Sequence, residues 1–220
     1  MISALDSGAE DAAGFVLAGG LSSRMGSDKA LIELDGEPQI VRALNILRGA
    51  GLSLTIAGGG FHLSAFAPML DDAGLGPLGG ICAALASTTA ECAVFLSVDM
   101  PLLPPSLISL LLRQARITES AVTGLSVSGF AQTFPCVVLR AVLPILQKEL
   151  DAGNKGCFSA LRAAATALHK PFTVLAVENL VQAGQLEHPR SLPAALWFLN
   201  VNTPSDLERA RSLVAVYQVI

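Results

Sequence analysis

Charged side chains are scarce in this 220-residue chain. They make up 15% of it against 52% hydrophobic residues, and 18 acidic and 14 basic residues give a net charge of −4. So apolar a chain can bury a sizeable core, which excludes an intrinsically disordered protein. No run of basic residues appears, so we expect no nucleic-acid partner. The length predicts one α/β domain around one core.

Long apolar runs are missing as well. No stretch reaches the roughly 18 consecutive apolar residues of a transmembrane helix. No basic residue precedes Arg24, so the pattern of a secretory signal is absent. We therefore expect a cytoplasmic protein with no membrane partner. The small and acidic residues at the start predict a flexible leader over residues 1–13, ahead of one domain over residues 14–220.

Cysteine and histidine are few and scattered. The cysteines form no C-x-x-C pair and stand among apolar neighbours, which predicts reduced, buried thiols and argues against a zinc site. The histidines have no evident partners and are expected at the surface. The residues concerned are Cys82, Cys92, Cys136 and Cys157, and His62, His169 and His188.

Short apolar segments alternate with helical patterns along the chain. This alternation is typical of a doubly wound, mostly parallel sheet, and thus of a Rossmann-like three-layer sandwich. The expected strands are residues 14–18, 52–57, 93–98, 121–126, 133–139, 172–177 and 196–201. The expected helices are residues 38–48, 78–87, 104–114, 141–150, 157–165 and 205–214, and residues 181–193 are expected to form a loop.

A glycine-rich loop follows the first expected strand, in the segment LAGGLSSRMGSDK at residues 17–29. Gly19 and Gly20 have no Cβ, so their backbone N–H groups can approach an anion closely. Arg24 and Lys29 add two cations, and a triphosphate needs both kinds of donor. The spacing matches neither a Walker loop nor G-x-G-x-x-G. The segment therefore predicts a different kind of phosphate-binding loop.

Three further segments combine turn residues with polar side chains. DDAGLGPLGG at residues 71–80 starts a helix, whose N-terminus attracts anions. LSVDMP places Asp99 directly after a central strand, where a carboxylate suits Mg²⁺. NVNTPSDL at residues 200–207 precedes the last helix, and Thr203 or Ser205 can cap that helix without any further role.

The pattern L-A-G-G-x-x-x-R-M-G-x-x-K resembles the N-terminal signature of the molybdenum cofactor guanylyltransferases, the MobA family. It is also similar to that of the wider nucleotidyltransferase group that includes sugar-phosphate nucleotidyltransferases. The three other segments match the family's aspartate before G-P-L-x-G, its D-x-P and its closing N-x-N-T-P-x-D-L. The resemblance covers residues 14–213 and implies a fold like that of the nucleotide-diphospho-sugar transferases.

The resemblance implies GTP as donor, molybdopterin or the molybdenum cofactor as acceptor, Mg²⁺ as cofactor and pyrophosphate as a product. It also implies transient contact with molybdoenzyme maturation proteins. Asp71 or Asp72 would hold the nucleotide, and we favour Asp71. The full implied set is Leu17, Ala18, Gly19, Gly20, Lys29, Asp71 and Asp99 for the nucleotide; Arg24, Lys29 and Asp99 for catalysis; Asp99 for the metal; and Asn200 and Asn202 for the acceptor.

Two positions depart from the family pattern. Phe134 stands where the family has a histidine before the proline, and residues 58–60 are glycines where the family has an asparagine. Both departures touch the base and acceptor regions. A nucleotidyltransferase that uses CTP, or one that acts on a sugar phosphate, therefore remains an alternative. A non-catalytic nucleotide-binding regulator on the same fold is a further one.

Overall fold

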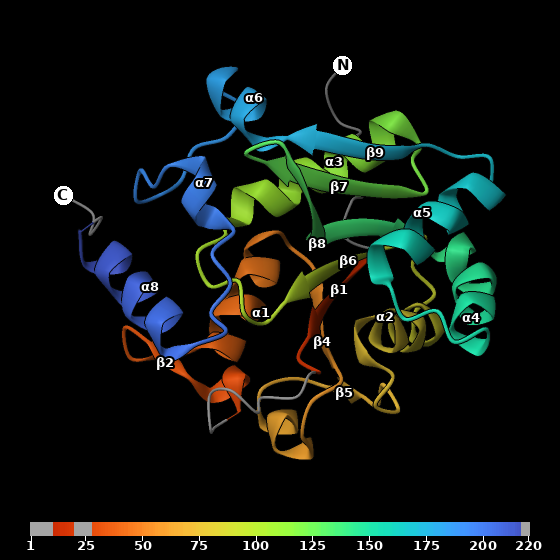
Figure 1. The fold of residues 1–220 in the computed structure, drawn as a ribbon, viewed down its shortest axis with the longest axis horizontal. Helices are drawn as coiled ribbons and strands as arrows, with labels where there is room; N and C mark the ends of the chain where they lie inside the picture. The colour runs from red at the N-terminus through yellow and green to blue at the C-terminus, as the bar shows by residue number, and fades with distance from the viewer. Residues whose placement is uncertain (1–10, 20–27, 217–220) are drawn as a thin grey trace.

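A seven-stranded sheet forms the centre of the molecule (Figure 1). The structure is a computed structural model that describes residues 11–19 and 28–216. In the order β5-β4-β1-β6-β8-β7-β9, β8 is antiparallel to β6 and β7, whereas the other neighbours are parallel. The mostly parallel sheet is thus confirmed. The strands are β1 Ala12–Leu17, β4 Ser53–Ala57, β5 Met69–Leu70, β6 Cys92–Ser97, β7 Val122–Val127, β8 Phe130–Leu139 and β9 Phe172–Ala176.

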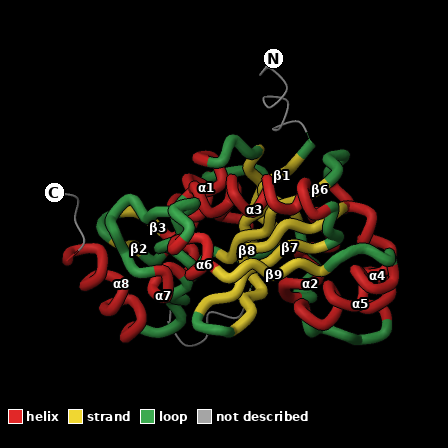
Figure 2. The backbone as a smooth tube through the Cα atoms, turned by 90° about the horizontal axis from the view of Figure 1, so that it is seen from above, coloured by secondary structure: helices red, strands yellow, loops and turns green. Residues whose placement is uncertain are grey.

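Helices cover both faces of this sheet. Figure 2 shows α1 and α3 on one side, and α2, α4 and α5 on the other. A small two-stranded sheet, β2 Glu33–Leu34 with β3 Glu37–Pro38, lies beside α8. The helices are α1 Gln39–Gly49, α2 Gly76–Ser87, α3 Pro105–Thr118, α4 Leu143–Asp151, α5 Cys157–Ala167, α6 Val177–Gln182, α7 Ala194–Trp197 and α8 Pro204–Val216. The described residues also include the 3₁₀ turns η1 Lys29–Leu31, η2 Phe61–Ala65 and η3 Arg140–Val142.

The two-residue period of the strands divides the core between the two faces. In β1, Val16 packs with α1 and α3, whereas Phe15 and Leu17 pack with α2 on the opposite face. Phe15 also stacks on Phe95 of β6, with ring centroids 5.7 Å apart. Because both faces are covered, these central strands are apolar throughout. The three-layer sandwich is therefore confirmed.

Two elements, β1 and α6, extend into segments that were expected to be a leader and a loop. β1 begins at Ala12, because Ala12 and Ala13 pair with Cys92 and Ala93 of β6. The strand thus starts two residues before its expected beginning at residue 14. α6 also extends through Gln182, into the segment expected to be a loop.

The expected strand at residues 196–201 is wrong. Residues Ala194–Trp197 form α7, which follows Pro193. Trp197 is buried, and its indole Nε1 donates a hydrogen bond to the Leu192 carbonyl at 2.7 Å. A short apolar run has no periodicity that separates a strand from a buried turn. Here the tryptophan bond closes a turn.

The cysteines follow the expectation and one histidine does not. The four thiols are free, three of them buried, and burial raises the pKa of Cys82 to about 11. His188, expected at the surface, is buried. Its Nε2 donates to the Leu102 carbonyl, its Nδ1 accepts from the Arg190 amide, and desolvation lowers its pKa. Within the described residues, no helix is long and apolar enough to cross a membrane.

Candidate active site

Four parallel strands end at one edge of the sheet, and predicted site residues follow them there. β1, β4, β5 and β6 are parallel neighbours, so their carboxyl ends share that edge. From β1 the chain continues to β4 on one side, and β6 later returns to the other side of β1. Ligands of open α/β sheets bind at such a switch point. The residues after these four strands include Gly19, Gly58, Asp72 and Asp99.

The loops after β1 and β4 meet at the carboxylate of Asp72. A Cβ atom added to Gly58 would lie 2.5 Å from Oδ2 of Asp72, and one added to Gly19 would also collide with Oδ2. Gly58 in addition has φ +77°, which L side chains rarely adopt. Glycine at both positions therefore allows the carboxylate to touch both loops.

Of the two neighbouring aspartates, Asp72 is the one that faces this edge. Its Oδ1 accepts a hydrogen bond from the Gly74 amide at 3.0 Å, which leaves Oδ2 against the glycine loops. Asp71 is exposed and accepts from the Ala73 amide at 2.8 Å. The sequence favoured Asp71, whereas the structure places Asp72, and not the exposed Asp71, against the two glycine loops.

The side chain of Lys29 points toward the C-terminal segment that contains Asn202. Its Nζ donates to Oδ1 of Asn202 at 2.5 Å, across 173 residues of sequence. Its backbone carbonyl accepts from Nε2 of Gln39 at 3.0 Å, and the Asp28 side chain caps the η1 turn at the Ala30 amide. The expected cation and an expected acceptor residue are thus in direct contact.

Asp99 lies in the turn after β6. Its Oδ1 accepts a hydrogen bond from the Ser97 hydroxyl at 2.6 Å, and its backbone carbonyl accepts from the Val201 amide at 2.9 Å. Among the described residues, Oδ2 makes no hydrogen bond, and no three His, Cys, Asp or Glu side chains gather as a ready-made metal site. A single half-buried carboxylate fits Mg²⁺, which keeps several water and phosphate ligands.

The segment after Asn200 is fixed by a capping box at the start of α8. The Asp206 amide donates to Oγ1 of Thr203 at 3.2 Å, and Oδ2 of Asp206 accepts from the Thr203 amide at 2.8 Å. Oδ2 also accepts from the Asn202 amide at 3.0 Å, whereas Asn200 donates to the Phe198 carbonyl at 3.3 Å. Thr203, rather than Ser205, is therefore the capping residue.

Thr203→Ala is expected to destabilise the protein by about 1 kcal/mol, because an N-cap hydroxyl is lost. Hydrogen bonds, that from Thr203 first, lower the pKa of Asp206. A lowered pKa stabilises the fold above the unfolded-state pKa, and that contribution disappears as the pH falls through the folded-state pKa. Thermal melting at neutral and acidic pH should show a penalty that shrinks in acid. Ser205→Ala is the control, and an equal penalty there would contradict the box.

Some predicted residues contribute less, or lie outside the described structure. The Leu17 side chain is in the core, and its carbonyl accepts from the Val98 amide at 3.1 Å, while the Ala18 amide donates to the Ala57 carbonyl. Gly20 and Arg24 lie outside the described residues. Phe134 packs against the core clusters on both faces of the sheet.

Two contributors were missed in the sequence. Gln39 is fully buried in the first turn of α1, and its Oε1 has no partner in the described part of the chain. Ser97 orients the Asp99 carboxylate. A polar residue inside an otherwise apolar helix face, and a hydroxyl two residues before the aspartate, were the available signals.

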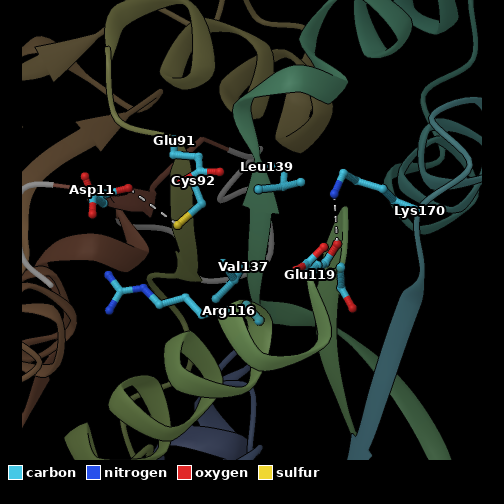
Figure 3. Close-up of a pocket in the computed structure, with 10 residues that line it drawn as sticks. Asp11, Glu91, Cys92, Arg116, Glu119, Val137, Leu139 and Lys170 are labelled. Atoms are coloured by element: carbon cyan, nitrogen blue, oxygen red, sulfur yellow. Dashed lines mark hydrogen bonds between the residues drawn. The ribbon is translucent and has the colours of Figure 1, made fainter. Parts of the chain in front are cut away.

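A pocket of about 360 Å³ lies at the opposite, amino-terminal edge of the sheet (Figure 3). It mixes carboxylates with two cations, Arg116 and Lys170, and the Cys92 thiol lies 3.7 Å from the Asp11 carbonyl. Three carboxylates against two cations do not suit a triphosphate. Its acidic residues are Asp11, Glu91 and Glu119.

Comparison with known families agrees with this geometry. The MobA-like NTP transferase domain matches residues 14–170. The chain belongs to this family. A probable molybdenum cofactor guanylyltransferase of Pelotomaculum thermopropionicum is 33% identical over 208 residues, which cover 91% of this chain and 92% of that protein. The MobA-like chain is therefore a nucleotidyltransferase of the molybdenum cofactor guanylyltransferase family.

Solved structures confirm the fold. The molybdopterin-guanine dinucleotide biosynthesis protein A of Archaeoglobus fulgidus has a TM-score of 0.73 at 18% identity, over 92% of this chain and 98% of that one. The 2-C-methyl-D-erythritol 4-phosphate cytidylyltransferase of Thermus thermophilus has a TM-score of 0.66 at 15% identity, over 92% and 98%. The fold is thus of the nucleotide-diphospho-sugar transferase type.

Proposed function

We propose that this MobA-like protein transfers GMP from GTP to molybdopterin and releases pyrophosphate. The observation that supports this most is the convergence of Gly19, Asp72 and Asp99 at one edge of the sheet. Lys29 adds a cation that contacts Asn202, on the segment proposed for the acceptor. A phosphate-binding loop, a metal carboxylate and an acceptor segment are what such a transfer requires.

The transfer proceeds by in-line displacement. An oxygen of the acceptor's terminal phosphate forms a bond to the α-phosphorus of GTP, the bond from the α-phosphorus to the α–β bridging oxygen breaks, and pyrophosphate leaves with that oxygen. The acceptor phosphate is already ionised near pH 7, so no general base is needed. Lys29 and Arg24 neutralise phosphate charge, and positioning and electrostatics lower most of the barrier.

Asp99 would hold the cofactor Mg²⁺ through Oδ2, while Ser97 fixes Oδ1. When bound, Mg²⁺ supplies charge neutralisation and orientation of the phosphate oxygens. The fixed carboxylate matters because Ser97 restricts its rotation before any ligand arrives. The protein's contribution is therefore an oriented ligand next to the phosphate-binding loop.

The test is pyrophosphate release with molybdopterin and Mg²⁺, measured separately for GTP, CTP, ATP and UTP. Release from GTP alone supports the proposal. Release from CTP would show that CTP, and not GTP, is the donor, with the same transfer chemistry. No release from any donor would refute the transfer and leave a nucleotide-binding regulator, which titration calorimetry with GTP would test.

Asp72→Ala is expected to raise the KM for GTP by roughly 10-fold or more, because a charged hydrogen-bond acceptor beside the nucleotide is lost. kcat should change little if this contact is equal in the ground and transition states. Asp71→Ala is the matched control, since Asp71 is the adjacent residue and its side chain is exposed. If steady-state kinetics show a larger increase in the KM for GTP in Asp71→Ala, Asp71 and not Asp72 contacts the nucleotide.

A further inference from the structure

A histidine joins the loop after β4 to the turn that carries Lys29. His62 lies in η2, which follows the glycines after β4. Its Nε2 lies 2.8 Å from Oδ2 of Asp28, the residue before Lys29. An ionised carboxylate only accepts hydrogen bonds, so Nε2 is the donor. The contact connects two loops that are 34 residues apart in sequence.

The same carboxylate also holds the turn itself. Oδ1 of Asp28 accepts from the Ala30 amide at 3.0 Å and caps η1, so one side chain binds the histidine and the turn together. From this turn the Lys29 side chain extends to Asn202, while Gln39 holds the Lys29 carbonyl. Asp28 thus caps the turn from which the Lys29 side chain extends.

Gly60 provides the space for the histidine ring. A Cβ atom added to Gly60 would lie 2.5 Å from Nδ1 of His62. The φ of Gly60 is −78°, which any residue adopts, so an alanine there would not strain the backbone. The ring is the end of a flexible side chain, and it would move away from Asp28 instead.

We propose that Asp28, Gly60 and His62 form a clasp that positions Lys29, with His62 as a positioning residue for the transfer. The inference rests on the proposed function and extends it to residues outside the family signature. A lysine has many rotamers, and misplacement by about 1 Å can cost up to about 10²-fold in rate. A partner that fixes the preceding carboxylate reduces this misplacement.

His62→Ala should lower kcat for pyrophosphate release by about 10-fold, with a smaller change in the KM for GTP, because Lys29 acts on charge that develops during transfer. His62→Gln should recover much of that loss, since its amide nitrogen can reach the position of Nε2 and still donate. His169→Asn is the matched control. His169 is exposed after α5, has φ +52°, which asparagine tolerates, and should leave kcat unchanged.

Gly60→Ala tests the clasp without altering either hydrogen-bonding partner. It should lower kcat about as much as His62→Ala, and the double variant should lose no more than either single variant, because both remove one interaction. The ¹⁵N resonance of His62 Nε2 should shift in Gly60→Ala, which reports the lost contact independently of activity. Losses that multiply in the double variant would overturn the clasp.

The outcomes separate the inference from the function on which it rests. If the wild-type protein releases pyrophosphate and His62→Ala has the same kcat, the inference alone is overturned. An unshifted ¹⁵N resonance in Gly60→Ala would also overturn it. Absence of pyrophosphate release from every nucleoside triphosphate by the wild-type protein would overturn the proposed function, and the inference with it. If His62→Ala fails to fold, Gly60→Ala and His62→Gln give the same decision.

Discussion

Asp99→Ala is expected to lower Mg²⁺-dependent pyrophosphate release by about 10³-fold or more, to a level near background. Removal of a charge-stabilising group from a transferase of this kind costs several kcal/mol of the barrier. The backbone bond from the Val201 amide to the Asp99 carbonyl does not involve the side chain, so the position of the closing segment should persist. Loss of activity with unchanged thermal melting would therefore report on the carboxylate.

Two companion variants separate charge from shape. Asp99→Asn keeps an oxygen for the Ser97 hydroxyl but removes the charge, and it should be nearly as inactive as Asp99→Ala. Ser97→Ala leaves the charge but not its orientation, and a loss of about 10-fold is expected from the missing charged hydrogen bond. Activity of Asp99→Asn within a few-fold of wild type, across a Mg²⁺ titration, would remove Asp99 from the metal role.

The location of the site was predictable because of how parallel strands pack. An apolar strand followed by glycines, and another followed by Asp99, already imply that both loops reach the same edge of one sheet. Strand direction, and not side-chain detail, fixes that result. This is why the short boundary error at Ala12 and the missed β5 did not displace the predicted site.

The contacts within the site were not predictable. The choice between Asp71 and Asp72 depends on the turn after a two-residue strand, which no periodicity determines. The bond from Lys29 to Asn202 joins residues 173 positions apart and depends on a tertiary fold in which α8 packs beside β2. Motifs that are far apart in a sequence can therefore indicate a shared site, while the pairing of their side chains follows from the tertiary fold.

Lys29→Ala is expected to lower kcat by roughly 10²-fold or more, with a smaller effect on the KM for GTP. The hydrogen bond from Lys29 Nζ to Asn202 and the one from Gln39 to the Lys29 carbonyl hold the lysine in place before the nucleotide binds, so we expect little reorganisation during the transfer. A preorganised cation stabilises developing charge better than a mobile one. Steady-state kinetics for GTP would measure both constants.

Lys29→Arg tests whether charge alone suffices. The planar guanidinium is wider than an ammonium group and cannot make the same single contact with Asn202, so only partial recovery is expected. Lys170→Ala, in the pocket at the opposite edge, is the matched control and should keep activity within about twofold of wild type, as expected for a surface change away from the site. Full activity of Lys29→Ala would exclude the lysine from the mechanism. The positive charge that neutralises the phosphates would then have to come from another residue, and Arg24 is the candidate in the sequence.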